Sequence, residues 1–144
     1  MSLLKTTNLG ISFGGLRAVD DVNIEIKDTK YDVPVSEESE KNVAAFIEEN
    51  NVKGKIIALN FFGASRGRKI NEENALIIIK RLGEMYKDYT IIILDSPNDR
   101  ETIHNILKKT DNKNVLFFEK SRTILDSISI INSSDLVVSL SLIH

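Results

Sequence analysis

The side chains best placed to do chemistry lie in one short basic segment, which reads Gly63-Ala64-Ser65-Arg66-Gly67-Arg68-Lys69. Its two glycines allow the backbone to approach a ligand closely, and three cationic side chains fall within four residues. Asn71, a good helix-capping residue, follows soon after, and the N–H groups at a helix start attract anions. The pattern predicts a phosphate-binding site, and the expected ligand is a nucleotide diphosphate. The alternative is a basic loop that is merely solvated.

The same order of glycine, glycine and lysine occurs in the Walker A loop, but this segment departs from that loop at two positions. A Walker A lysine directly follows the second glycine, and a serine or threonine follows the lysine and reaches magnesium. Here Arg68 separates Gly67 from Lys69, and Ile70 has no hydroxyl group. ATP hydrolysis at this segment is therefore not expected.

Four other side chains are weaker candidates. Asp95 ends an apolar stretch and is more typical of a turn or a helix cap than of a ribose or sugar contact. Glu119 ends the next stretch, where it either accepts hydrogen bonds from a base or ribose or is simply solvated. His104 falls in a helical pattern, which favours a surface or packing role. His144 is the last residue, where fraying is the default, yet it lies just past the last predicted strand.

Composition excludes several classes of function. The chain has 144 residues, of which 42% are apolar and 28% charged, as in an ordinary globular domain. A formal charge of −2 argues against nucleic acid as a partner. There is no cysteine and there are only two histidines, so a cysteine or histidine metal cluster is not expected. With no membrane-spanning run and no signal peptide pattern, we expect a cytoplasmic protein.

Apolar stretches alternate with amphipathic helical patterns over most of the chain. The predicted strands are residues 55–61, 89–95, 115–118 and 135–140, and the predicted helices begin near Ser36, Asn71, Ser96 and Arg122. For the third helix, the segment Ser96-Pro97-Asn98-Asp99 supplies a capping serine, a proline at the first helical position and an acid three residues after the cap. Strands that are apolar throughout predict an α/β fold with a doubly wound, Rossmann-like parallel sheet.

The first part of the chain has a different pattern. Residues 7–27 read as short strands, in which Val22, Ile24 and Ile26 alternate with polar residues after a turn at Gly14-Gly15. We therefore expect an N-terminal β segment over residues 1–30 and a truncated α/β domain over residues 31–144.

The expected sheet also predicts where a ligand binds. Open parallel sheets bind ligands beyond the carboxyl ends of their strands, at the point where the strand order reverses. If the four strands follow the common order 3-2-1-4, the first and fourth strands are neighbours at that point. The basic segment follows the first strand and His144 follows the fourth, so this order predicts that Lys69 and His144 line one cleft.

Residues 31–144 resemble the C-terminal, donor-binding half of family 9 glycosyltransferases, the lipopolysaccharide heptosyltransferases. The resemblance rests on IIALNFFGASRGRKINEENALIIIKRL, YTIIILDSPNDRETIHNIL, SRTILDSISIINSSDLVVSL and the terminal histidine. It implies a GT-B architecture whose C-terminal half binds a nucleotide sugar such as ADP-heptose, without a cofactor or an obligatory metal. It also implies that Lys69 meets the diphosphate beside Arg66 and Arg68. The full set of expected substrate-binding residues is Gly63, Ala64, Ser65, Arg66, Arg68, Lys69, Glu119 and His144.

The chain departs from this family's pattern near its C-terminus. The family has Asp-Thr, three residues and then His after the fourth strand, whereas this sequence reads VVSLSLIH. The resemblance matches His144, but the Asp-Thr pair is missing. The acceptor-binding half, which supplies the catalytic carboxylate in the family, is also missing, so we expect a donor domain that cannot transfer sugar by itself.

The first 27 residues resemble a different family. LLKTTNLGISFGGLRAVDDVNIEIK is similar to the start of a branched-chain amino acid ABC transporter ATPase, in which Phe13 would stack on adenine. The Walker A loop expected shortly after Lys27 is absent, and no LSGGQ-type signature occurs. A fused leader fits better than a transporter subunit.

Three functions therefore stand as hypotheses. The first is a glycosyltransferase-related domain that binds a nucleotide sugar, with peripheral association at the inner membrane in full-length members of the family. The second is a non-catalytic α/β binding or interaction module, and the third is a fragment of an ABC transporter ATP-binding protein. The open edge of a truncated sheet is also a surface through which two copies can pair.

Overall fold

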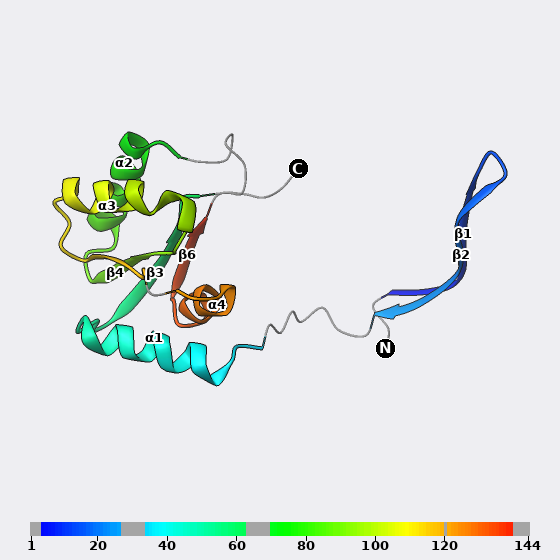
Figure 1. The fold of residues 1–144 in the computed structure, drawn as a ribbon, viewed down its shortest axis with the longest axis horizontal. Coiled ribbons are helices and arrows are strands. Elements are labelled where there is room, and N and C mark those ends of the chain that lie inside the picture. The colour runs from blue at the N-terminus through cyan, green and yellow to red at the C-terminus, as the bar shows by residue number, and fades with distance from the viewer. Residues whose placement is uncertain (1–3, 27–33, 63–69, 120, 140–144) are drawn as a thin grey trace. The chain divides into compact units, whose positions relative to one another are not determined.

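The computed structural model describes residues 4–26, 34–62, 70–119 and 121–139 (Figure 1). The chain divides into two compact units, Met1–Pro34 and Val35–His144. The smaller unit is a β hairpin and the larger one is an α/β domain. None of the described helices combines the length and apolar character needed to cross a membrane.

The larger unit is built on four parallel strands, β3 (Lys55–Asn60), β4 (Tyr89–Ile93), β5 (Val115–Phe117) and β6 (Leu136–Ser139). Their order across the sheet is β5-β4-β3-β6. Counted along this unit, that is the order 3-2-1-4, so the predicted strand order is confirmed. β3 lies between β4 and β6, which places the first and fourth strands of the unit side by side.

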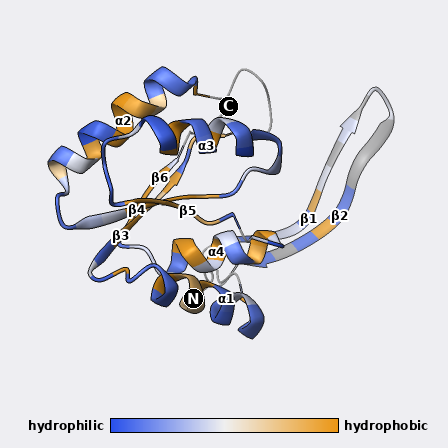
Figure 2. Ribbon diagram, turned by 60° about the vertical axis from the view of Figure 1, so that its left-hand side comes forward, coloured by the Kyte–Doolittle hydropathy of each residue, from blue (hydrophilic) through white to orange (hydrophobic). Residues whose placement is uncertain are grey.

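Helices cover both faces of this sheet (Figure 1). On one face, α2 (Glu72–Met85) and α3 (Arg100–Lys109) pack on alternate strand residues such as Ile57 and Ile91. On the other face, α1 (Glu37–Glu49) and α4 (Ile124–Asn132) pack on the residues between them, such as Ala58 and Ile92. Figure 2 shows apolar residues running along the strands, while the helices alternate between apolar and polar residues. Because both faces are buried, the strands are apolar throughout, and the predicted α/β class is confirmed.

Two of the predicted helix starts are confirmed. The Ser36 hydroxyl accepts a hydrogen bond from the backbone N–H of Ser39 at 3.2 Å, and α1 follows. The Asn71 side chain accepts one from the backbone N–H of Asn74 at 2.8 Å, and α2 follows. Each cap satisfies an N–H group that has no partner within its helix.

The start of the third predicted helix differs from expectation. Pro97–Asp99 forms a short 3-10 helix, η2, and α3 begins only at Arg100. Ser96 precedes the proline as predicted, but its side chain caps no backbone N–H group. Its hydroxyl instead donates a hydrogen bond to the Asp99 carboxylate at 2.7 Å. The acid three residues after the serine therefore accepts a charge-assisted hydrogen bond from its hydroxyl.

The smaller unit pairs β1 (Leu4–Phe13) with β2 (Leu16–Ile26) in antiparallel fashion. The predicted turn at Gly14-Gly15 is confirmed, with φ angles of 51° and 87°. The pairing register shifts at several points, and Asn8 and Asp21 both have positive φ. Asn and Asp tolerate that region better than most residues. The hairpin is therefore more irregular than its alternating sequence predicts.

Candidate functional site

The carboxyl ends of the parallel strands form the edge at which the sequence predicts a ligand site. After segment 63–69, the backbone N–H of Ile70 donates a hydrogen bond to the carbonyl of Phe61 at 3.3 Å. The chain thus returns to the end of β3 before α2 begins. Beside this point, Asn60 of β3 is in register with Ser139, the last described residue of β6. The segments that follow β3 and β6 therefore start from neighbouring strands.

Most of the predicted substrate-binding residues lie outside the described part of the chain: Gly63, Ala64, Ser65, Arg66, Arg68, Lys69 and His144. Their roles stay predictions, as does the convergence of Lys69 and His144. Glu119 is the predicted site residue that the structure describes, and it lies at the end of β5.

The start of α2 carries two acidic residues beside the predicted anion site. Glu72 forms an ion pair with Lys109 of α3, whereas Glu73 is exposed. The pair places a positive charge against the carboxylate in the first turn of the helix. It therefore reduces the repulsion that an acidic first turn exerts on a bound anion.

At the end of β4, Asp95 is held by Arg100. Arg100 donates two hydrogen bonds to the Asp95 carboxylate, from Nε to Oδ1 at 3.0 Å and from Nη2 to Oδ2 at 2.6 Å. The carboxylate is 4% exposed. This hydrogen bonding raises the pKa of Arg100, as do the charges of Asp95 and Glu119, against the opposing effect of burial. Asp95 is therefore neither a free ligand nor a simple turn residue, because a bidentate arginine engages it.

At the end of β5, Glu119 lies against His104 of α3. The Nε2 atom of His104 is 3.1 Å from Oε1 of Glu119, and both side chains are about half exposed. The His104 ring also meets the ring of Phe117 edge-on, with 5.6 Å between ring centroids. His104 thus has the packing role that its helical position favoured. A carboxylate has about four acceptor sites, so Glu119 can accept a ligand hydroxyl beside its contact with His104.

A hollow of about 260 Å³ opens beside Asp95. It is lined by Asp95, Pro97, Ser121, Arg122, Thr123, Ile124 and Ser127. Ile124 is 77% exposed at its rim, which is unusual for a large aliphatic side chain. The hollow therefore combines one apolar surface with hydroxyl groups, a carboxylate and a cation.

The buried side chain of Asp126 holds the loop behind this hollow. Its Oδ2 accepts hydrogen bonds from the backbone N–H groups of Arg122 at 2.8 Å and Thr123 at 3.3 Å. Burial alone would raise the pKa of Asp126, but hydrogen bonding outweighs burial and lowers it below its ordinary value. Thr123 and Asp126 together form the capping box of α4. The backbone that carries Arg122 and Thr123 is thereby fixed.

Sequence reasoning missed Arg100, Arg122 and Ile124 as residues of this edge. The spacing of Asp95 and Arg100 was the available signal, because an acid at a strand end and an arginine in the following helical turn are close enough to pair. The sequence did not indicate that Ile124 is exposed, since an isoleucine at a helix start is normally predicted to lie in the hydrophobic core. Within the described residues, no group of three or more histidines and carboxylates is arranged to hold a metal ion.

The fold and this edge define a doubly wound α/β domain whose strand order reverses beside β3. Among solved structures, the chain is similar to the glycosyl transferase family 9 protein from Veillonella parvula DSM 2008, with a TM-score of 0.62 and 14% identity over 74% of this chain. It is also similar to the ADP-heptose lps heptosyltransferase II of E. coli, with a TM-score of 0.56 and 15% identity over 76% of this chain. At these identities the likeness shows the fold.

This chain spans only part of those proteins, 30% of the first and 33% of the second. No protein-family model matches the sequence, and no curated protein matches it either. The resemblance of residues 1–27 to an ABC transporter ATPase finds no support in these comparisons.

Proposed function

We propose that residues 31–144 bind a nucleotide sugar at the carboxyl edge of the sheet, as a glycosyltransferase-related donor domain. Arg66, Arg68 and Lys69 bind the diphosphate, and the backbone of residues 63–65 approaches it closely. Glu119 accepts hydrogen bonds from the nucleoside, and His144 contacts the ligand from beyond β6. ADP-heptose is the first donor to test, because one structural neighbour is an ADP-heptose heptosyltransferase.

The observation that carries this proposal is the position of β3 beside β6. In open α/β sheets, ligands bind where the strand order reverses, and segment 63–69 starts and returns at that point. The capped start of α2 lies next to it, and a helix N-terminus favours an anion. The fold shared with two glycosyltransferases supports the same ligand class.

We expect binding without sugar transfer from this chain alone. In the family that residues 31–144 resemble, the acceptor-binding half supplies the catalytic carboxylate. The expected contribution of this domain is to hold and orient the donor.

Titration calorimetry of the full chain with ADP and ADP-heptose tests the proposal. We expect binding by the unaltered chain, and roughly tenfold weaker binding for Lys69→Ala and Arg68→Ala, because each loses a charge-assisted contact with the diphosphate. Lys53→Ala is the matched control, since exposed Lys53 precedes β3 at the opposite end of the strand. If no heat of binding is measured at millimolar ligand, or if all variants bind with equal affinity, the donor-site proposal fails and a non-catalytic α/β module is favoured.

A second titration separates the nucleoside from the diphosphate. If Glu119 contacts the ribose or base, Glu119→Ala weakens ADP binding by roughly fivefold and leaves the affinity for inorganic pyrophosphate unchanged. His104→Ala removes the contact between Glu119 and His104 but keeps the Glu119 carboxylate, so the affinity for ADP should be unchanged. Equal losses for ADP and pyrophosphate in Glu119→Ala would contradict this role.

A further inference from the structure

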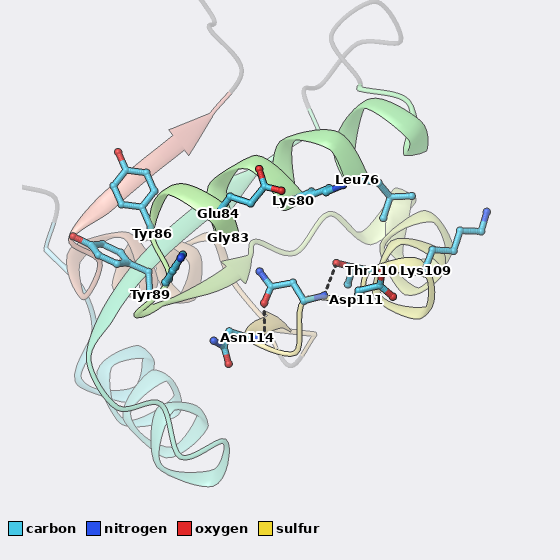
Figure 3. A pocket seen from close by; sticks show the side chains of 12 residues that line it. Leu76, Lys80, Gly83, Glu84, Tyr86, Tyr89, Lys109, Thr110, Asp111 and Asn114 are labelled. Carbon is cyan, nitrogen blue, oxygen red and sulfur yellow. Dashed lines mark hydrogen bonds between the residues drawn. The ribbon is translucent and has the colours of Figure 1, made fainter.

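A second hollow, of about 450 Å³, runs along one side of α2 (Figure 3). Its walls come from one side of α2, from the turn into β4 and from the segment between α3 and β5. β4 and β5 begin beside Tyr89 and Asn114, so this part of the lining is at the amino edge of these strands. A cavity of this volume is in the range of small-molecule sites.

Asn112 is fixed in the wall of this hollow. Its Oδ1 accepts a hydrogen bond from the backbone N–H of Asn114 at 2.9 Å, and its backbone N–H donates a hydrogen bond to Oγ1 of Thr110 at 3.2 Å. The side-chain amide lies against Gly83 of α2, where an added Cβ atom would be 2.5 Å from Nδ2. A glycine inside a helix costs about 1 kcal/mol relative to alanine. Here the missing side chain makes room for a positioned amide.

The charges around the hollow nearly cancel. Two lysines, Lys80 and Lys87, and two acids, Glu84 and Asp111, line it. The fifth charged lining residue, Lys109, is already paired with Glu72. A small anion therefore gains little net attraction here, unlike at the three cations of the basic segment. A neutral ligand with many hydroxyl groups can use both the donors and the acceptors.

Two aromatic rings complete the lining. Tyr86 and Tyr89 lie with their ring centroids 5.1 Å apart at one side of the hollow (Figure 3). Lys55 lies 5.5 Å from the centroid of the Tyr89 ring. Aromatic side chains offer an apolar face beside polar groups, and a sugar ring presents C–H faces between its hydroxyl groups.

We propose that this hollow is a saccharide-binding site, which takes one or two neutral sugar units between Tyr86, Asn112 and the charged side chains of α2. The inference rests on the lining alone and holds whether or not the carboxyl edge binds a nucleotide sugar. Asn112 and Glu84 hydrogen-bond the hydroxyl groups, and Tyr86 packs on the sugar face.

Titration of the ¹⁵N-labelled full chain, followed by NMR, tests this site. The probes are D-glucose, D-mannose, D-galactose and N-acetyl-D-glucosamine to tens of millimolar, and sodium pyrophosphate as an anion. We expect at least one sugar to shift the amide resonances of Gly83, Asn112 and Asn114 in a saturable way. Pyrophosphate should leave these resonances in place.

Variants of the wall make the test specific. Asn112→Ala should weaken sugar binding by roughly fivefold, and Gly83→Ala should do the same by displacing the Asn112 amide. Alanine favours the helix by about 1 kcal/mol, which offsets the hydrogen bond to Asn114 that the displaced amide loses, so Gly83→Ala should nearly retain the melting temperature. Met85→Ala, in the same helix but 71% exposed, is the control. The proposal is overturned if no sugar shifts these resonances, if only pyrophosphate does, or if Asn112→Ala binds as well as the unaltered chain.

Discussion

At the scale of single residues, buried polar groups in this protein are held by several partners at once. Asp126 is the clearest case, because its side chain is 2% exposed and accepts hydrogen bonds from the N–H groups of Arg122 and Thr123. Ser39 and Asn42 of α1 also hydrogen-bond it. One carboxylate thus caps α4 and joins it to α1.

Asp126→Asn removes this charge without changing the size of the side chain. We expect a loss of about 2 kcal/mol in the free energy of unfolding at neutral pH, because hydrogen bonds to charged groups are among the stronger ones. Denaturant unfolding followed by circular dichroism measures it. Asp88→Asn is the control, since the Asp88 side chain is exposed.

The same carboxylate predicts a pH dependence. Its pKa in the folded state is lower than the ordinary value of 3.8, so folding favours the ionised form. The stabilisation is complete well above 3.8 and is lost as the pH falls through the folded-state pKa. The difference in stability between the unaltered chain and Asp126→Asn should therefore shrink in acid. A difference that stays constant from neutral pH to about pH 2 would contradict this account.

Residue-level prediction from the sequence succeeded where one local contact decides the outcome. The caps at Ser36 and Asn71 need only an N–H group three residues away, and both are formed. It failed at Ser96, whose hydroxyl donates to the Asp99 carboxylate and caps no backbone N–H group. The contact of His104 with Glu119 joins residues fifteen positions apart, which no local pattern reports.

At the scale of elements, the turn from α1 into β3 depends on a glycine. Gly54 has φ +108°, a region that residues with a Cβ atom rarely adopt, and an added Cβ would lie 3.4 Å from the carbonyl oxygen of Asp88. The fold therefore has room for an alanine Cβ atom at this position, and the free-energy cost of the substitution comes from backbone strain. Gly54→Ala should destabilise the fold by about 1–2 kcal/mol.

Thermal unfolding of Gly54→Ala beside Lys53→Ala measures this cost. Lys53 is the exposed neighbour in the same turn, and its substitution should leave the melting temperature unchanged. A Gly54→Ala variant as stable as the unaltered chain would show that the turn can adopt a different conformation.

Element positions were predictable because burial on both faces leaves an unbroken apolar run in each strand. β3 was expected over residues 55–61 and spans 55–60, and β4 was expected over 89–95 and spans 89–93. The strand ends are less well predicted, since Leu94 is buried like the strand before it although β4 has ended. The alternation in β2 could not reveal the register shifts, which depend on how β1 pairs with it.

At the scale of the whole molecule, the two units differ in what stabilises them. Residues 35–144 contain two buried clusters, one on each face of the sheet. Residues 4–26 form a two-stranded hairpin, and such a hairpin is at best marginally stable by itself in water. The larger unit should therefore fold without the smaller one.

Deletion of residues 1–30 tests this independence directly. Because both clusters come from the larger unit, the melting temperature of residues 31–144 should stay within about 2 °C of that of the full chain. Its affinity for ADP should be retained as well, since every proposed donor contact lies beyond residue 60. A cooperative transition lowered by about 10 °C would instead show that the hairpin contributes to the stability of the α/β domain. A loss of ADP binding at an unchanged melting temperature would place part of the donor site in the hairpin.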